Sequence, residues 1–158
     1  MASLVDTNVL VYCFDPRDRH KQRIAEGVLR DGLRDDSLVL PHQAIVELIP
    51  ALCKPRAELD GEGLLSAVEA GIVAESLMDQ FAVVYPTQEV LVTALRGAAA
   101  YSLSWFDAHL WAYAEVFGLP EILSEDFAHG RRYGSVRVRD PFLAAAGRLH
   151  ELPRLYGP

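Results

Sequence analysis

Short apolar segments alternate with helix-length amphipathic segments along the chain, and this alternation constrains the fold more than any other feature. Helical periodicity predicts helices at residues 17–33, 42–53, 62–80, 89–100 and 105–117. Apolar runs predict a first strand within 3–12 and further strands at 38–41, 81–85, 122–123 and 136–138, the last at a sheet edge. Strands separated by helices favour an α/β fold, with a central, mainly parallel sheet covered on both faces.

The chain has 158 residues, of which 51% are hydrophobic, enough for one domain with a buried core. We expect this domain to span residues 1–143 and a short C-terminal tail to occupy 144–158. The sequence has no run of about 18 apolar residues that would predict a membrane span, and its start lacks the pattern of a secretory signal. Together with Cys13 and Cys53, which we expect to be free thiols, these features predict a cytoplasmic protein.

The first apolar run is interrupted by a single aspartate, Asp6, followed by Thr7 and Asn8. Ligands of open parallel sheets bind in the crevice at the carboxyl ends of the strands, so a strand ending at Asp6 would deliver this carboxylate to that crevice. The alternative is that these three residues only cap the next helix, which their residue types commonly do. The stretch alone does not decide between the two interpretations.

Three further acids stand where a solvated surface acid is not expected. Glu47 lies in an apolar helix, Asp107 follows two aromatic residues, and Asp126 follows a buried strand. Unpaired buried carboxylates are costly, and few arginines are near Glu47 and Asp107 in sequence, so a shared divalent cation is the more economical partner. Oxygen ligands suit Mg²⁺ or Mn²⁺. The formal net charge of −7 argues against binding nucleic acid through bulk positive charge, but a cation held by clustered acids leaves a nuclease possible.

Four motifs, in order, carry a family resemblance: LVDTNVLVY, VEL, SLSWFDAHLWA and ILSEDFAHGRRYGSVRVRDPF. Over residues 2–143 this succession resembles a PIN domain and, within that family, a VapC-type toxin ribonuclease of bacterial toxin–antitoxin pairs. The resemblance implies a three-layer α/β/α sandwich with a mainly parallel sheet of four to five strands. It also implies an endoribonuclease that uses Mg²⁺ or Mn²⁺ and a metal-activated water, leaving 5′-phosphate and 3′-hydroxyl ends.

The same resemblance assigns roles to individual positions. The acids that it implies for catalysis and metal binding are Asp6, Glu47, Asp107 and Asp126. The positions that it implies as supporting are Asn8, Thr7 and Ser124, with Glu125 secondary because it adjoins Asp126 and either acid could reach the metal. As partners it implies an RNA substrate, a cognate VapB-like antitoxin, and a second copy of the chain in a homodimer within a higher toxin–antitoxin assembly.

Basic and aromatic side chains near the acidic motifs are candidates for contact with RNA. Arg131 and Arg132 begin the densest basic cluster and could grip phosphates, although a solvated loop and edge strand explains the cluster equally well. Trp105 and Trp111 are six residues apart and so face different directions. We expect one of them in the core and consider the other for stacking on a base. The histidines beside the acidic motifs, His109 and His129, could also touch the substrate.

Two other functions compete with this interpretation. A haloacid-dehalogenase-like phosphatase also has an aspartate at the end of its first strand. That family needs a second acid two residues later, where this chain has Asn8. The other alternative is a catalytically inactive PIN fold that serves as a binding module, although all four acids are present.

Overall fold

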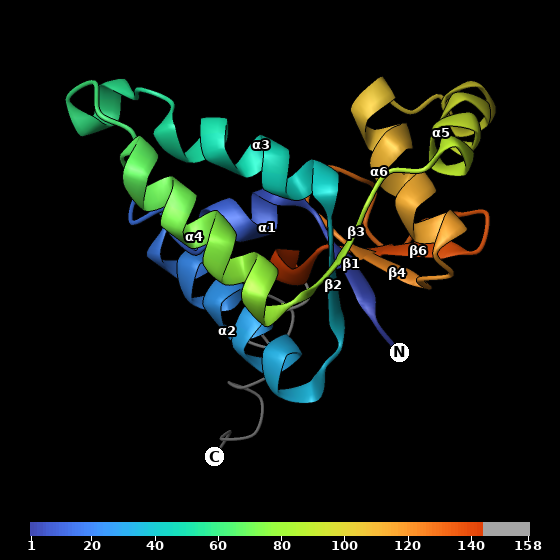
Figure 1. The fold of residues 1–158 in the computed structure, drawn as a ribbon, viewed down its shortest axis with the longest axis horizontal. Coiled ribbons are helices and arrows are strands. Elements are labelled where there is room, and N and C mark those ends of the chain that lie inside the picture. Colours follow the sequence, from blue (N-terminus) through green and yellow to red (C-terminus); the bar gives the residue numbers. More distant parts are fainter. Residues whose placement is uncertain (144–158) are drawn as a thin grey trace, which may run out of the picture.

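The computed structural model describes residues 1–143, which form three layers with the sheet between two groups of helices (Figure 1). The strands are β1 (Ser3–Val5), β2 (Leu38–Pro41), β3 (Ala82–Val84), β4 (Glu121–Leu123), β5 (Arg132–Tyr133) and β6 (Val136–Arg139). The helices are α1 (Thr7–Tyr12), α2 (Arg19–Asp35), α3 (His42–Cys53), α4 (Ala67–Gln80), α5 (Gln88–Tyr101) and α6 (Trp105–Val116), with a 3-10 turn at Ala57–Leu59. The predicted tail, 144–158, lies outside the described residues.

The strands form one sheet in the order β3-β2-β1-β4-β6-β5. All neighbours are parallel except β5 and β6, which pair antiparallel. The predicted mainly parallel sheet is therefore confirmed, and the two-residue β5 adds an antiparallel strand to five parallel ones. The prediction of an edge strand at 136–138 is wrong, because β6 pairs with β4 on one side and with β5 on the other.

Two hydrophobic cores lie on opposite faces of the sheet, because successive strand residues point to opposite faces. Val5 and Leu123 pack with residues of α1, α2, α3 and α4. Their neighbours Leu4 and Ile122 pack with residues of α5 and α6. In Figure 1 the first group of helices lies left of the sheet and the second lies right. The expected cover on both faces is thus confirmed.

N-terminal capping residues determine where several of the helices begin. The strand expected within 3–12 ends at Val5, because Asp6 caps α1 and the apolar residues after it are helical. The helix expected at 62–80 begins only at Ala67, where Ser66 and Glu69 form a capping box. The bounds predicted for α3 are confirmed, and the helix continues through Pro50. Within residues 1–143 no helix is long and apolar enough to span a membrane.

Two helical glycines give a matched test of the packing. A Cβ added at Gly97 in α5 would overlap the buried ring of Trp111, whereas a Cβ added at Gly71 in α4 meets nothing within 4 Å. We expect Gly97→Ala to lower the free energy of unfolding by about 1–3 kcal/mol through overpacking. Gly71→Ala should instead raise it by up to about 1 kcal/mol through helix propensity. Urea unfolding of both variants checks this, and a Gly97→Ala protein as stable as the wild type would contradict the close α5–α6 packing.

Candidate active site at the ends of strands β1 and β4

The site lies where the chain changes direction within the sheet. From β1 the chain passes to β2 and β3 on one side, and it returns to the other side of β1 as β4. In α/β sheets, the crevice outside the carboxyl ends of the strands at such a switch point is where ligands bind. The Asp6 backbone N–H donates to the Leu123 carbonyl at 3.0 Å, which aligns the ends of the two strands. Residues after β1 and after β4 therefore meet, although they are more than 100 positions apart in sequence.

Asp6 is the buried centre of this meeting point, with 7% of its surface exposed. One carboxylate oxygen accepts from the Thr7 backbone N–H at 2.6 Å, the cap of α1. The other accepts from the Ser124 hydroxyl at 2.6 Å and from the Asn8 amide at 3.0 Å. Asp6 thus follows the end of β1 at the carboxyl edge of the sheet and also caps α1, so the predicted position and the predicted cap fall on one residue.

Asn8 links Asp6 to the acid after β4. Its amide nitrogen lies 3.1 Å from a carboxylate oxygen of the exposed Asp126 and 3.3 Å from the Ser124 hydroxyl. The same hydroxyl accepts from the Asp126 backbone N–H at 3.1 Å and so fixes the turn after β4. The Asn8 Oδ1 atom is buried and has no hydrogen-bond partner. A polar oxygen is therefore left over in the middle of the acidic site.

Glu47 joins the site from α3. One carboxylate oxygen accepts from the Thr7 hydroxyl at 3.1 Å, and the other accepts from the Gln43 amide at 3.0 Å. Gln43 lies one helical turn before Glu47, so the two side chains share a face of α3. Thr7, expected only as a supporting position, is the contact that connects Glu47 to the Asp6 end of the sheet.

Asp107 lies in the first turn of α6, where its backbone N–H donates to the capping Ser104 side chain at 3.2 Å. The Gln43 amide also donates to the Phe106 carbonyl at 3.1 Å, which ties this turn to the Glu47 side of the site. No hydrogen bond within residues 1–143 joins the Asp107 carboxylate to the other three acids. The structure thus connects Asp6, Glu47 and Asp126 through shared polar partners, whereas Asp107 is outside this network and next in sequence to Phe106, whose carbonyl Gln43 contacts.

Glu125 belongs to a different contact. Its carboxylate pairs with the Lys21 ammonium and accepts from the Tyr12 hydroxyl at 2.8 Å. Lys21 also lies over the Tyr12 ring. This ion pair draws Glu125 toward α1 and α2, whereas Asp126 contacts Asn8. Of the two adjacent acids, Asp126 is the one that the structure joins to the Asp6 network.

The arginines of the basic cluster lie farther along the sheet. Arg132 pairs with Arg137 of β6, which in turn pairs with Glu121, the first residue of β4. Arg132 is therefore level with the amino end of β4, whereas the acids follow its carboxyl end. The guanidinium of Arg131 lies 4.7 Å from the centre of the Tyr133 ring. RNA contacts by Arg131 and Arg132 stay a prediction, and this placement gives them no support.

The electrostatics of the site favour a cation. Burial raises the pKa of the Asp6 carboxyl to about 6, and the hydrogen bonds from Ser124 and Thr7 only partly oppose this rise. The charges of Asp126 and Glu47 push the same pKa further up. Within residues 1–143, no lysine or arginine forms an ion pair with any of the four predicted acids. The negative charge is thus held by neutral donors and not by a basic side chain.

The side chains of the site are of the type that binds a hard divalent ion, but they are not arranged closely enough to hold one. Carboxylate oxygens and the unpartnered Asn8 Oδ1 are the ligand type that Mg²⁺ or Mn²⁺ prefers. In the described part of the chain, however, no three acidic, histidine or cysteine side chains are grouped closely enough to hold a metal. Asn8 and Thr7 stand between the acids and hold them in a hydrogen-bonded chain. Binding an ion would require these side chains to exchange those hydrogen bonds for the metal.

Sequence reasoning did not identify Gln43 as part of this site. Its amide contacts Glu47 and Phe106, and its carbonyl oxygen lies 2.9 Å from the His109 ring nitrogen. His109, which we considered for substrate contact, is therefore tied to Glu47 through Gln43. Burial lowers the pKa of His109, and the charge of Glu47 opposes this. The only sequence signal for Gln43 is its four-residue spacing from Glu47.

Comparison with known proteins gives a family and a fold. A family model described as PIN domain matches residues 3–151. A toxin–antitoxin complex from Klebsiella pneumoniae aligns with a TM-score of 0.60 at 16% identity, covering 89% of this chain and 98% of that one. DNA-bound VapBC from Salmonella typhimurium aligns with a TM-score of 0.63 at 16% identity, covering 89% and 99%. Mycobacterium tuberculosis VapC20, a sarcin–ricin loop cleaving toxin, aligns with a TM-score of 0.58 at 14% identity, covering 79% and 90%. No curated protein sequence matches the chain.

Removing the Asp6 charge should stabilise the metal-free protein at neutral pH. The pKa of about 6 in the folded state lies above the ordinary value of 3.8, so the free energy of unfolding falls as the pH rises from about 4 through 6. A rise of this size corresponds to about 3 kcal/mol at pH 7, and hydrogen bonds lost in the variant reduce the gain. We expect Asp6→Asn to unfold at higher urea than the wild type at pH 7.5 in EDTA, with the difference vanishing near pH 4. A variant less stable than the wild type at pH 7.5 would contradict the buried, costly carboxylate.

Proposed function

The chain belongs to the PIN domain family, and from this premise we propose that it is a metal-dependent endoribonuclease and the toxin of a VapBC-type toxin–antitoxin pair. One observation carries the proposal. Carboxylates from segments far apart in sequence share hydrogen-bond partners at the switch point of the sheet, and no basic side chain of residues 1–143 pairs with them. The family match also argues against a haloacid-dehalogenase-like phosphatase, whose second acid is replaced by Asn8.

In the proposed reaction the protein holds the acidic side chains in position. The residues that would hold Mg²⁺ or Mn²⁺ are Asp6, Glu47, Asp107 and Asp126. Thr7 and Gln43 orient the Glu47 carboxylate, and the Ser124 hydroxyl orients Asp6. A bound divalent ion would supply an activated water for in-line attack on phosphorus and would offset charge on the leaving oxygen. The products would carry 5′-phosphate and 3′-hydroxyl ends.

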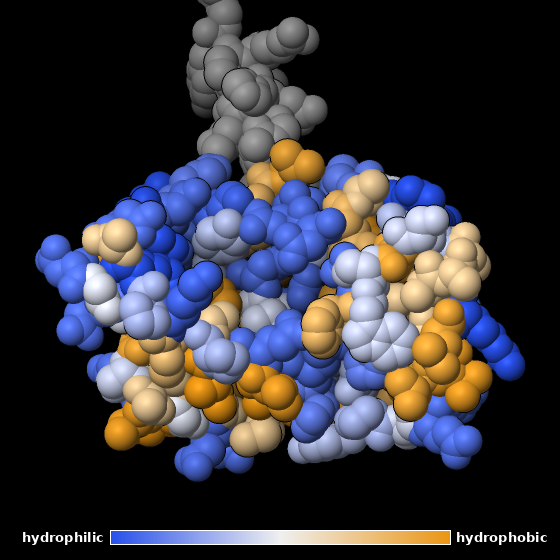
Figure 2. All heavy atoms as spheres, turned by 90° about the horizontal axis from the view of Figure 1, so that it is seen from above, coloured by the Kyte–Doolittle hydropathy of each residue, from blue (hydrophilic) through white to orange (hydrophobic). Residues whose placement is uncertain are grey.

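The exposed apolar surface supports a protein partner. Figure 2 looks down on the top of Figure 1 and shows hydrophobic side chains gathered on both sides of a hydrophilic band. Val46 and Ile49 of α3 and Val68 and Ile72 of α4 are exposed, and the two helices contact each other. An amphipathic helix of a VapB-like antitoxin could lay its apolar face on this surface, a recurrent mode of recognition. We further propose that the toxin forms a homodimer within the toxin–antitoxin assembly and acts in the cytoplasm.

Substituting the acids should abolish cleavage. We expect Asp6→Asn, Asp107→Asn and Asp126→Asn each to reduce RNA hydrolysis by more than about 100-fold, beyond the roughly 10–100-fold typical of groups that only support metal ligands. The measurement is cleavage of end-labelled RNA with Mg²⁺ or Mn²⁺, with circular dichroism as a check on folding. EDTA should stop the wild-type protein equally.

Glu125→Gln is the matched control, because it removes one negative charge directly beside Asp126 but at a residue paired with Lys21. We expect this variant to cleave RNA at nearly the wild-type rate. Cleavage that persists in EDTA or in the Asp6→Asn protein would overturn the proposal and favour the inactive binding module or a different chemistry. A Glu125→Gln protein as inactive as Asp126→Asn would assign the metal-site role to both acids.

A charge placed on the apolar surface should release the antitoxin. Ile72→Asp on α4, where the side chain is 62% exposed, should weaken co-purification with the product of the neighbouring open reading frame because it buries an unpaired charge in the contact. Leu95→Asp on α5, where the side chain is 56% exposed, is the control and should leave the complex intact. Failure of the wild-type protein to recover any partner, or equal loss with both variants, would count against this surface.

A further inference from the structure

A cavity of about 320 Å³ opens beside Glu47, between the first turns of α3 and α6. This volume is within the range of small-ligand pockets, which are mostly apolar with a few polar groups. The lining residues that matter to its chemistry are Gln43, Glu47, Trp105, Phe106, His109 and Tyr113. Because Glu47 belongs both to this lining and to the acidic site, a ligand in the cavity would extend directly from that site.

The walls of the cavity are flat aromatic rings. Trp105 and His109 lie with ring centres 6.0 Å apart, and His109 packs edge-on against Tyr113 at 5.2 Å. Trp105 is 41% exposed and Phe106 is 65% exposed, unusual for large aromatic side chains in a packed helix turn. Trp111, six residues farther along α6, is buried and belongs to the core. The two tryptophans thus separate as predicted, with Trp105 free to stack on a ligand.

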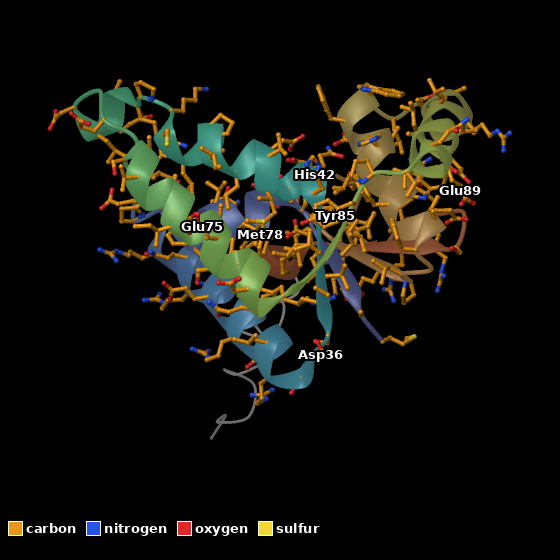
Figure 3. The ribbon with its side chains drawn as sticks, viewed as in Figure 1. Asp36, His42, Glu75, Met78, Tyr85 and Glu89 are labelled. Atoms are coloured by element: carbon orange, nitrogen blue, oxygen red, sulfur yellow. The ribbon has the colours of Figure 1, made fainter. Side chains whose placement is uncertain are left out.

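The opposite rim of the cavity is formed by the segment that enters α3. His42, at the start of α3, lines the cavity and lies beside Tyr85, with ring centres 5.7 Å apart (Figure 3). Pro86, the next residue after Tyr85, also lines the cavity. The cavity is therefore walled by segments from three parts of the chain, and its shape is set by the fold and not by one mobile loop.

The lining also holds an unused hydrogen-bond donor. Tyr113 is fully buried, and its hydroxyl has no hydrogen-bond partner. The backbone N–H of Gln43 approaches this oxygen closely enough to oppose the rise in its pKa that burial causes. The contact between this N–H and the hydroxyl oxygen does not meet hydrogen-bond geometry. Since an N–H is a donor, it would in any event leave the hydroxyl proton without an acceptor. A buried donor without an acceptor costs free energy, so the site gains when a ligand brings an acceptor to it.

We propose that this cavity binds one unpaired base of the RNA substrate, stacked on Trp105 and hydrogen-bonded by the Tyr113 hydroxyl. The inference rests on the proposed function, because that function identifies the ligand as RNA. It adds which residues of the protein contact the base next to the cleaved bond. Single-stranded RNA is recognised by stacking unpaired bases on aromatic side chains and by hydrogen bonds to their edges. Every base has a flat face and an acceptor atom, which match the aromatic walls and the hydroxyl.

An apolar side chain from a protein partner fits the same cavity less well. It would fill the space between the rings but would leave the Tyr113 proton without an acceptor. Gln43 connects the cavity to the acids, since the same amide contacts Glu47 and its carbonyl oxygen contacts His109. A base seated here would place its own phosphate beside Glu47, which is where the proposed hydrolysis takes place.

The test measures the binding of RNA strands with and without bases to a variant that is expected not to cleave them. The Asp6→Asn protein is titrated in EDTA with labelled single-stranded nonamers of random sequence and with an abasic ribose-phosphate nonamer of the same charge. We expect the strands with bases to bind about 5- to 150-fold more tightly, the range for one stacked base. Adding Trp105→Ala should remove most of this preference, whereas adding Leu95→Ala on the exposed face of α5 should not.

Tyr113→Phe separates a ligand contact from a structural role. Removing a buried, unpartnered hydroxyl should raise the melting temperature of the free protein and yet weaken binding of the strands with bases, while binding of the abasic strand stays unchanged. If the hydroxyl only supported the fold, the variant would be less stable and both strands would be affected alike, which would overturn the role of Tyr113.

Other outcomes overturn the inference as a whole. Equal binding of strands with and without bases would do so, and so would Trp105→Ala weakening both strands equally. If Trp105→Ala dissociates copies of the chain in sedimentation while the preference for bases remains, the cavity is a protein contact. The titration uses a cleavage-deficient protein. If the wild-type protein does not hydrolyse RNA, the proposed function is refuted, but the difference in binding between strands with and without bases is still measured independently.

Discussion

The rest of the site depends on one buried carboxylate, Asp6, at the end of the central strand. Its position follows from the backbone, because Asp6 both ends β1 and caps α1. Hydrogen bonds from Thr7 and Ser124 return only part of the solvation lost on burial, so its pKa stays raised. A fold selected for stability alone would place an apolar or paired residue here. Instead, the chain buries a carboxylate whose ionised form is destabilised and which a bound cation would stabilise. Such a residue is expected where function and stability compete.

The strand order of the sheet brings other polar side chains to the buried Asp6 carboxylate. Because β1 lies between β2 and β4, the turns after β1 and β4 are adjacent, and Ser124 reaches Asp6 across 118 positions of sequence. The two cores on opposite faces hold α3 and α6 on either side of the crevice. Glu47 and Asp107 thus belong to helices of different layers. This explains why Gln43, which spans from α3 to the first turn of α6, is the side chain that joins the two layers.

Sequence patterns predicted what is local and missed what arises from contacts between distant segments. An apolar run stopped by Asp6 is visible in sequence, and so is the apolar face of the twelve-residue α3. The six-residue α1 is too short to show a helical period, so its apolar residues predict a continuation of the strand. The bridge by Asn8, the link from Gln43 to α6 and the unpartnered hydroxyl of Tyr113 depend on tertiary placement. Of these, only the spacing of Gln43 from Glu47 is visible in the sequence, and that spacing does not predict the contact with α6. The comparison with PIN domains gives the family but no residue contacts.

The charge of the chain connects the acidic site with the aromatic cavity. A protein with a formal net charge of −7, whose site acids lack basic partners within residues 1–143, repels phosphates over long distances. Affinity for RNA must then come from short-range interactions, and stacking on an exposed ring is insensitive to that repulsion. The cation at the acids and the base beside them would therefore act together, one offsetting charge and the other holding the strand. Binding that depends on stacking should weaken little with added salt, in contrast to proteins that bind RNA through arrays of lysine and arginine.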